Sequence, residues 1–297
     1  MKHSFLLFLV AACAHAQQVA LTFDDLPAAG TLPPGATRDS IANDVIRALQ
    51  AAKAPPVWGF LNAQKLDKDP TLAGVLALWT QAGFPLGNHT YSHTDLHAAT
   101  IEDFEKDIAA NETTLRAYMG DKDWHWFRYP FLREGNTLEK RHALIAYLRQ
   151  HGYQTAQTTL DFEDYAWNAP YARCLARNDL PSLEWLKTSY LSTATEYIQL
   201  GQKMARLLYG RDIRHVMLLH LGGFQTVMLP KLIDLLRQSG FQLITLEEAQ
   251  KDAAYQSDPD AASKYGGTLL EQMMAARKLQ TPPHAEKPFA RLDAICR

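Results

Sequence analysis

The chain reads VALTFDD over residues 19–25, an apolar run that ends in two adjacent carboxylates. Six further short apolar runs follow it, and longer segments with the period of an amphipathic helix separate them. This alternation predicts an α/β fold, in which parallel strands form a sheet or barrel and helices pack outside it. The expected strands span residues 19–23, 57–61, 85–88, 125–128, 154–157, 215–220 and 241–246.

The segments between these strands predict helices, because their apolar residues recur on one face. One connection, residues 165–214, is too long for the repeating pattern and contains a helical stretch over 183–208, so we expect it to shape a binding site beside the barrel mouth. The strand pattern stops after residue 246, and one more helix is expected over 268–279. The other expected helices span residues 38–52, 71–82, 100–119, 138–151 and 229–239.

The composition is that of an ordinary folded chain. Its 297 residues, 47% hydrophobic and 21% charged, suit one large core and exclude global disorder. A formal net charge of −2 offers no basic field for nucleic acid phosphates, so a nucleic acid partner is not expected. Three cysteines are too few for a disulfide scaffold.

The first sixteen residues predict an export signal. Residues 1–4 are cationic, and the apolar run 5–12 is too short to span a bilayer. Ala14-His15-Ala16 then has the small-x-small pattern of a cleavage site, so the mature chain is expected to begin at Gln17 and to be periplasmic or secreted, without a transmembrane segment. The alternative is a lipoprotein, cleaved before a lipid-bearing Cys13.

Cleavage after Ala16 leaves Cys174 and Cys296 as the remaining thiols, in an oxidising compartment. One hypothesis is a disulfide that ties the C-terminal tail to the middle of the chain. The alternative is two unpaired cysteines.

Two clusters have side chains that suit a metal site. Asp24 and Asp25 repel each other unless a cation or proton lies between them, although an Asp-Asp-Leu-Pro turn is an alternative. His89 and His93 are four residues apart, so both would reach one metal if the segment were helical; a solvated loop is the alternative. His97 adds a third histidine, and the spacing does not say which pair binds.

A metalloprotease would have Glu directly after the first histidine, and Thr90 stands there, which excludes that class.

Arg128 ends an aromatic strand and would orient a carboxylate or form a surface ion pair. Asp164 lies in the acidic stretch 161–165. His220 ends the most apolar run, where either a core histidine or, at a barrel strand end, a catalytic one is expected.

In this order the residues resemble the five motifs of the polysaccharide deacetylase family, also called the NodB-homology or carbohydrate esterase family 4 domain. The resemblance covers about residues 19–249 and implies a distorted, NodB-type (β/α)7 barrel, with a long helical insertion before the last motif and a C-terminal helical extension. The expected domains are residues 17–250 and 251–297. The matching residues are Asp24 and Asp25, His89 and His93, Arg128, Asp164, and His220.

The resemblance implies one divalent metal ion, held by Asp25, His89 and His93. Two histidines and a carboxylate suit zinc, and also cobalt, nickel or iron. It also implies that Asp24 is the general base that deprotonates water, and that His220 is the general acid that protonates the leaving group.

Three further roles follow from the resemblance. Arg128 would orient Asp24, Asp164 would keep His220 protonated, and the backbone N–H of Phe131 would hold the oxyanion.

The sequence departs from the family pattern at three places. Leu26-Pro27 follows the Asp pair where Gly-Pro is usual, and Tyr129 and Phe131 replace the commoner Pro and Tyr. Tyr165 stands where Trp is usual, with Trp167 as a possible substitute wall. We expect Tyr129, Phe131, Tyr165 and Trp167 to border the substrate.

The predicted function is therefore a metal-dependent hydrolase that removes acetyl groups from an N-acetylated glycan. The alternatives are hydrolysis of an O-acetyl ester or of a small amide or imide on the same fold, and a non-catalytic glycan-binding pseudoenzyme. In the last case tryptophans would be the stacking platforms, namely Trp58, Trp124, Trp126 and Trp167. The sequence predicts no oligomeric state.

Overall fold

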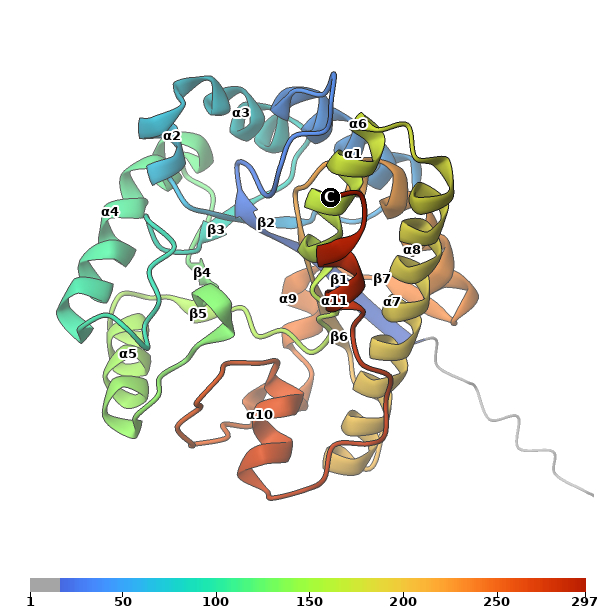
Figure 1. Ribbon diagram of the computed structural model, residues 1–297. Helices are drawn as coiled ribbons and strands as arrows, with labels where there is room; N and C mark the ends of the chain where they lie inside the picture. The colour runs from blue at the N-terminus through green and yellow to red at the C-terminus, as the bar shows by residue number, and fades with distance from the viewer. Residues whose placement is uncertain (1–16) are drawn as a thin grey trace, which may run out of the picture.

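The computed structural model describes residues 17–297 (Figure 1), and the expected export signal with its Cys13 alternative lies outside the described residues. Seven parallel strands form the sheet, each within or overlapping a predicted run. Their order is β5-β4-β3-β2-β1-β6, and β7 pairs with the first residues of β1. The strands are β1 (Gln17–Leu26), β2 (Trp58–Leu61), β3 (Leu86–Asn88), β4 (Trp126–Phe127), β5 (Gln154–Thr155), β6 (His215–His220) and β7 (Phe241–Leu243).

The sheet curves into a distorted barrel, which confirms the predicted fold class. Between β5 and β6 the barrel continues through an irregular segment rather than a strand: Leu160 forms an isolated parallel bridge with Met217. The Leu160 N–H donates to Val216 O at 3.0 Å, and the Leu218 N–H donates to Leu160 O at 3.0 Å. Parallel strands end on the same side of a barrel, so their carboxyl ends meet around one mouth.

Helices surround the strands on the outside (Figure 1). Strand β7 stops at Leu243, short of the predicted residue 246, because the side chain of Thr245 caps a new helix there. Near the predicted positions are α1 (Arg38–Ala51), α3 (Ala73–Gln81), α4 (Ile101–Met119), α5 (Leu138–Gln150), α7 (Leu180–Tyr209), α8 (Gln225–Gln238) and α10 (Leu269–Ala276). Helices that the sequence pattern did not predict are α2 (Gln64–Lys68), α6 (Asn168–Ala176), α9 (Leu246–Gln250) and α11 (Phe289–Ala294).

The C-terminal extension packs on the barrel and on the long insertion. Leu270 and Met273 of α10 are buried against Met204 of α7. Near the end of the chain, Cys296 forms a disulfide with Cys174 of α6. The Cα–Cα distance is 5.1 Å, and the bond confirms the hypothesis that these two cysteines pair. Within residues 17–297, no helix combines the length and apolar character needed to cross a bilayer.

Candidate active site

Asp24 and Asp25 end β1 at the barrel mouth. Asp24 is buried and lies opposite His220 in the register of β1 and β6. Asp25 is partly exposed and has a φ of 65°, a left-handed conformation that is uncommon outside glycine. The Ala28 N–H donates to Asp25 O at 3.1 Å, so the backbone turn considered as an alternative is present together with the paired carboxylates.

Asp25, His89 and His93 form the one cluster among the described residues whose side chains could hold a metal ion. Their ligand atoms all lie within 4.8 Å of one another. Asp25 Oδ1 is 3.4 Å from His93 Nε2 and 4.0 Å from His89 Nε2. His97 is not part of this cluster.

The two histidines are neutral, and the tautomer of His89 suits a metal ligand. His89 Nδ1 lies 2.8 Å from Arg128 O, and a carbonyl only accepts, so Nδ1 carries the proton and Nε2 keeps a free lone pair. Burial lowers the pKa of His89 and of His93 to about 4. The donor set therefore fits a divalent cation of the zinc type.

The backbone that presents these histidines is a loop, which corrects the helical geometry considered for residues 89–93. Thr90 and His93 each have a φ of 60°, which is a left-handed backbone conformation and interrupts any right-handed helix at both residues. The 4.9 Å between the two ring centroids results from this loop and not from a helical i, i+4 spacing.

Lys65 is a site residue that the sequence pattern did not identify. It lies on α2, and its Nζ is 3.5 Å from Asp25 Oδ1 and donates to Asp25 O at 2.8 Å. Burial works to raise the pKa of Asp25, but Lys65 and the nearby histidines bring it well below its usual range. Asp25 is therefore an anion at any ordinary pH, as a metal ligand must be.

Arg128 lies beneath the mouth with 1% of its surface exposed and holds Asp24 in place. Its Nη1 is 3.2 and 3.3 Å from the two carboxylate oxygens of Asp24. Two further donors tie the guanidinium to the barrel, Nε to Ala156 O at 2.6 Å and Nη2 to Thr22 Oγ1 at 3.2 Å. Burial raises the pKa of Asp24, and Arg128 only partly opposes this, so the carboxylate is a stronger base than a free aspartate.

His220 is paired with Asp164 on the other side of Asp24. Asp164 Oδ1 lies 2.7 Å from His220 Nδ1, and Asp164 Oδ2 accepts the His220 backbone N–H at 3.0 Å. Gln225 Nε2 also donates to Oδ2. Burial works to lower the pKa of His220, but the charge and hydrogen bond of Asp164, with Asp25 and Asp24, raise it to about 9. The imidazole is thus protonated at neutral pH.

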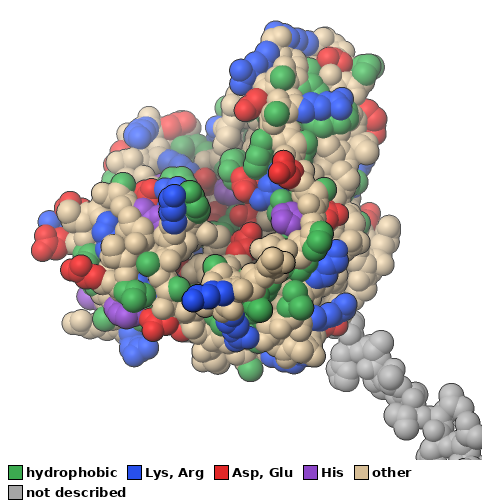
Figure 2. Space-filling model, turned by 60° about the horizontal axis from the view of Figure 1, so that its bottom comes forward, with side chains coloured by type: hydrophobic (Ala, Val, Ile, Leu, Met, Phe, Trp, Pro, Cys, Tyr) green, Lys and Arg blue, Asp and Glu red, His purple; other side chains and the backbone are tan. Residues whose placement is uncertain are grey.

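The side chains of Asp24, Asp25, His89, His93 and His220 face a cavity of about 730 Å³. Figure 2 shows the hollow, with acidic and histidine side chains inside it. Phe131, Tyr165 and Tyr265 line it with exposed aromatic rings. The ring centroid of Phe131 is 4.4 Å from that of His93, and the ring of Tyr165 is 5.1 Å from that of His220.

Two of the expected wall residues lie in the core instead, which corrects that expectation. Tyr129 is 3% exposed, and its ring packs on Phe104 and Phe127. Trp167 is fully buried, and its Nε1 donates to Ser189 Oγ at 2.9 Å. The tryptophans suggested as stacking platforms are also buried, with 3 to 6% of the surface exposed for Trp58, Trp124 and Trp126.

The cavity has a second wall, which combines the acidic stretch 161–165 with residues that no sequence motif indicated. Asp161 and Glu163 of the loop after β5 line it, and Lys287 pairs with Glu163 at 2.7 Å. The C-terminal extension contributes all the remaining residues of this wall, namely Tyr265, Gly266, Gly267, Glu271 and Thr281. Their positions depend on how the extension packs, and nothing in their spacing along the chain relates them to the metal ligands.

The fold and site define a parallel α/β barrel with a carboxylate and two histidines at its mouth. The family model described as Polysaccharide deacetylase matches residues 11–156. This match confirms the resemblance to the polysaccharide deacetylase family over residues 11–156. The comparison with curated proteins finds no match.

Solved structures of this family share the fold. The chitin deacetylase from the fungal pathogen Colletotrichum lindemuthianum is 20% identical with a TM-score of 0.53, over 85% of this chain and 96% of that one. A family 4 carbohydrate esterase from Streptomyces lividans, in complex with acetate, is 17% identical with a TM-score of 0.50, over 78% and 95%. A family 4 pseudoenzyme from Bacillus anthracis is 14% identical with a TM-score of 0.53, over 79% and 65%.

Proposed function

We propose that this protein is an exported, metal-dependent hydrolase that removes acetyl groups from an N-acetylated glycan. One observation carries the proposal: a base, Asp24, and a protonated acid, His220, border the same cavity as the cluster of Asp25, His89 and His93. The match to the polysaccharide deacetylase family supports the acetylated glycan as substrate. The Cys174–Cys296 disulfide supports export, because such bonds persist in oxidising compartments.

Asp25, His89 and His93 would hold one divalent ion, with zinc as our first choice and cobalt, nickel or iron as alternatives. When bound, this ion would polarise the acetyl carbonyl and make water more acidic. Lys65 would hold Asp25 in its anionic form and in position for this task.

The remaining chemistry belongs to side chains of the barrel mouth. Asp24, held by Arg128, would take a proton from the water that attacks the acetyl carbon. The Phe131 N–H, which donates no hydrogen bond within the described chain, would stabilise the developing oxyanion. His220 would donate a proton from Nε2 to the departing nitrogen as the carbon–nitrogen bond breaks, and acetate and a free amine would leave.

The test is acetate release from N-acetylated oligosaccharides, O-acetyl esters and small amides, with metal removed and then restored. We expect metal-dependent release from the oligosaccharides, and loss of it in Asp24→Asn. The matched control is Asp234→Asn, which changes an exposed carboxylate on α8 and is expected to behave as wild type. Metal-independent release, or equal rates in the two variants, would defeat the mechanism. Faster release from esters or small amides would favour those substrates, and no release from any would favour a glycan-binding pseudoenzyme.

A further inference from the structure

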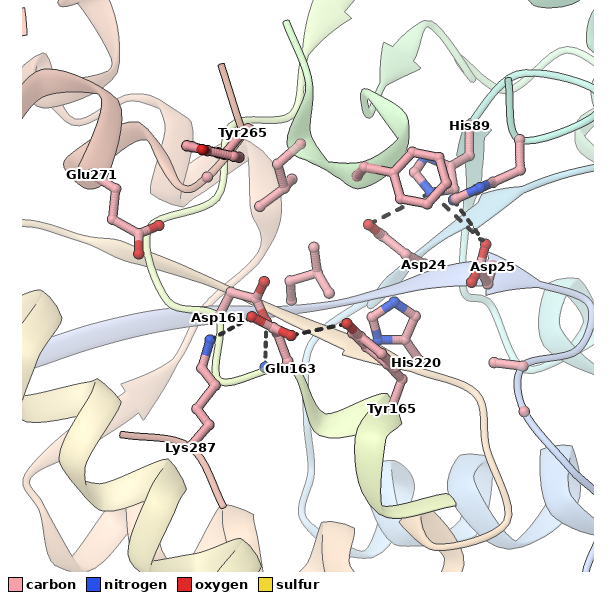
Figure 3. A pocket seen from close by; sticks show the side chains of 18 of the residues that line it. Asp24, Asp25, His89, Asp161, Glu163, Tyr165, His220, Tyr265, Glu271 and Lys287 are labelled. Atoms are coloured by element: carbon pink, nitrogen blue, oxygen red, sulfur yellow. Dashed lines mark hydrogen bonds and ion pairs between the residues drawn. The ribbon is translucent and has the colours of Figure 1, made fainter. Parts of the chain in front are cut away.

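Tyr265 places an aromatic ring in the catalytic cavity from outside the barrel. The residue lies in the C-terminal extension, lines the cavity and leaves 71% of its surface exposed. Figure 3 shows it across the cavity from His89, Asp24 and Asp25, on the side where Glu271 also lies. Lys264 Nζ lies over the ring, 4.9 Å from its centroid, and the rest of the exposed ring surface is available for a ligand.

The backbone beside Tyr265 is packed directly on the loop that carries the proposed oxyanion donor. Gly266 has a φ of 76°, and a Cβ atom there would lie 2.5 Å from Phe131 O. Only glycine allows this close approach. On the other side, the Ser263 N–H donates to Gly135 O at 3.0 Å. The backbone that carries the ring is therefore held against the Phe131 loop and is not a free tail.

The residues that follow Tyr265 are tied to the barrel as well. The Leu269 N–H donates to Thr158 O at 2.8 Å, and Gln272 Nε2 donates to Glu134 Oε1 at 2.8 Å. Glu134 is itself buried and paired with Arg141 at 2.8 Å. A platform whose backbone is held on both sides loses little backbone entropy when a ligand packs on its ring, which favours binding.

The polar groups near this ring suit a sugar. A pyranose has apolar C–H faces that pack on an aromatic ring and hydroxyl groups around its edge that both donate and accept. The same wall offers carboxylate acceptors from Glu163, Asp161 and Glu271, and the ammonium donor of Lys287. A cavity of about 730 Å³ is larger than an acetyl group alone requires, since sites for whole drug-sized ligands span about 300–1,000 Å³.

We propose that Tyr265 forms a binding subsite for the sugar next to the acetylated one, so that the substrate contains at least two linked sugars. The inference rests on the proposed function, because it names the class of glycan that the same site accepts. The proposal also assigns a function to the C-terminal extension. This segment supplies an aromatic surface for sugar binding, which the buried tryptophans cannot supply.

The test compares Tyr265→Ala with Tyr265→Phe on N-acetylglucosamine and its oligomers up to the tetrasaccharide. The quantity measured is kcat/KM for the tetrasaccharide divided by kcat/KM for the monosaccharide. We expect Tyr265→Ala to lower this ratio about 3- to 10-fold, the size of an aromatic packing contact. Tyr265→Phe keeps the ring face and is expected to keep the ratio. Phe289→Ala, a change of an exposed aromatic in the same extension but outside the cavity, is the matched control.

An unchanged ratio in Tyr265→Ala, or an equal loss in Tyr265→Phe, overturns the subsite. If wild-type protein releases no acetate from any substrate, the proposed function fails while the subsite is still tested. Calorimetric titration with the tetrasaccharide then decides: weaker binding by Tyr265→Ala than by Phe289→Ala supports the subsite, and equal binding overturns it.

Discussion

Replacement of Asp164 with Asn is expected to move the alkaline limit of activity toward neutral pH. In the wild-type protein the Asp164 carboxylate accepts three N–H groups, from His220 Nδ1, the His220 backbone and Gln225 Nε2. An asparagine side chain has one acceptor oxygen and one NH₂ donor. Its NH₂ faces either the imidazole, which then loses its hydrogen-bond acceptor, or the other two donors, while the amide oxygen still accepts from Nδ1. In both cases the protonated form of His220 loses the negative charge beside it.

The magnitude follows from the environment of His220. Its pKa is raised from 6.5 to about 9 although burial alone would lower it, and Asp164 is the largest of the raising causes. Loss of an adjacent opposite charge lowers such a pKa by about 1–3 units, which puts the pKa of His220 in the variant between about 6 and 8. The shift corresponds to roughly 1.4–4 kcal/mol between the two protonation states.

The assay is kcat/KM against pH for acetate release by the metal-loaded protein. In the proposed mechanism His220 is the acid, so activity is expected to fall as pH rises through its pKa: near pH 9 in the wild type, and at lower pH in Asp164→Asn. The same shift affects stability. A raised histidine pKa stabilises the folded state fully below about pH 6.5, and this stabilisation is lost as pH rises through about 9. The two proteins should differ most in unfolding free energy at acid pH.

The reasoning is refuted if Asp164→Asn loses activity equally at every pH and its alkaline limb stays near pH 9. Asp234→Asn, at an exposed carboxylate that makes no side-chain hydrogen bond within residues 17–297, controls for the general effect of removing a carboxylate. A titration of His220 followed by NMR gives an independent check, because it reports the imidazole itself.

Three more outcomes are expected. Asp24→Asn should lower kcat/KM about 10²- to 10⁴-fold, as is typical for loss of a general base, while metal content measured by mass spectrometry stays at the wild-type level. His93→Ala should weaken zinc binding, measured by competition with a chelator, by more than about 10- to 100-fold, which is the loss typical when only a hydrogen-bond partner of a metal ligand is removed. The control His142→Ala changes a surface histidine and should leave zinc binding unchanged. Cys296→Ser should lower the unfolding free energy by about 2–5 kcal/mol in denaturant titrations, because the bond to Cys174 closes a loop with a sequence separation of 122.

Much of the barrel could be predicted from the sequence, because strand formation depends on local apolar runs and on the turns between them. All seven runs contain strands, and the polar residues that end them meet at one mouth because parallel strands share a direction. The prediction was wrong about one strand end, also for a local reason. Strand β7 is shorter than its apolar run, because Thr245 caps a helix that begins within that run.

The resemblance to a family named acidic and histidine side chains that the structure brings together at the barrel mouth, while their geometry came from loops. His89 and His93 meet through two positive-φ residues, which no spacing rule for helices or strands describes. Lys65 reaches Asp25 from a short helix that lies outside every motif. Such contacts join residues far apart in the sequence. The local pattern of apolar and polar residues does not predict them.

The aromatic residues show which properties follow from the sequence and which depend on the tertiary structure. By itself the sequence determined that aromatic side chains stand near the motifs, and it determined which carboxylates and imidazoles end the strands. Only packing decided that Tyr129 and Trp167 are core residues whereas Tyr265, from an extension with no motif, lines the cavity. The physical reason is that an aromatic ring has the same apolar surface in either place, and its burial is set by the distant segments that fold over it.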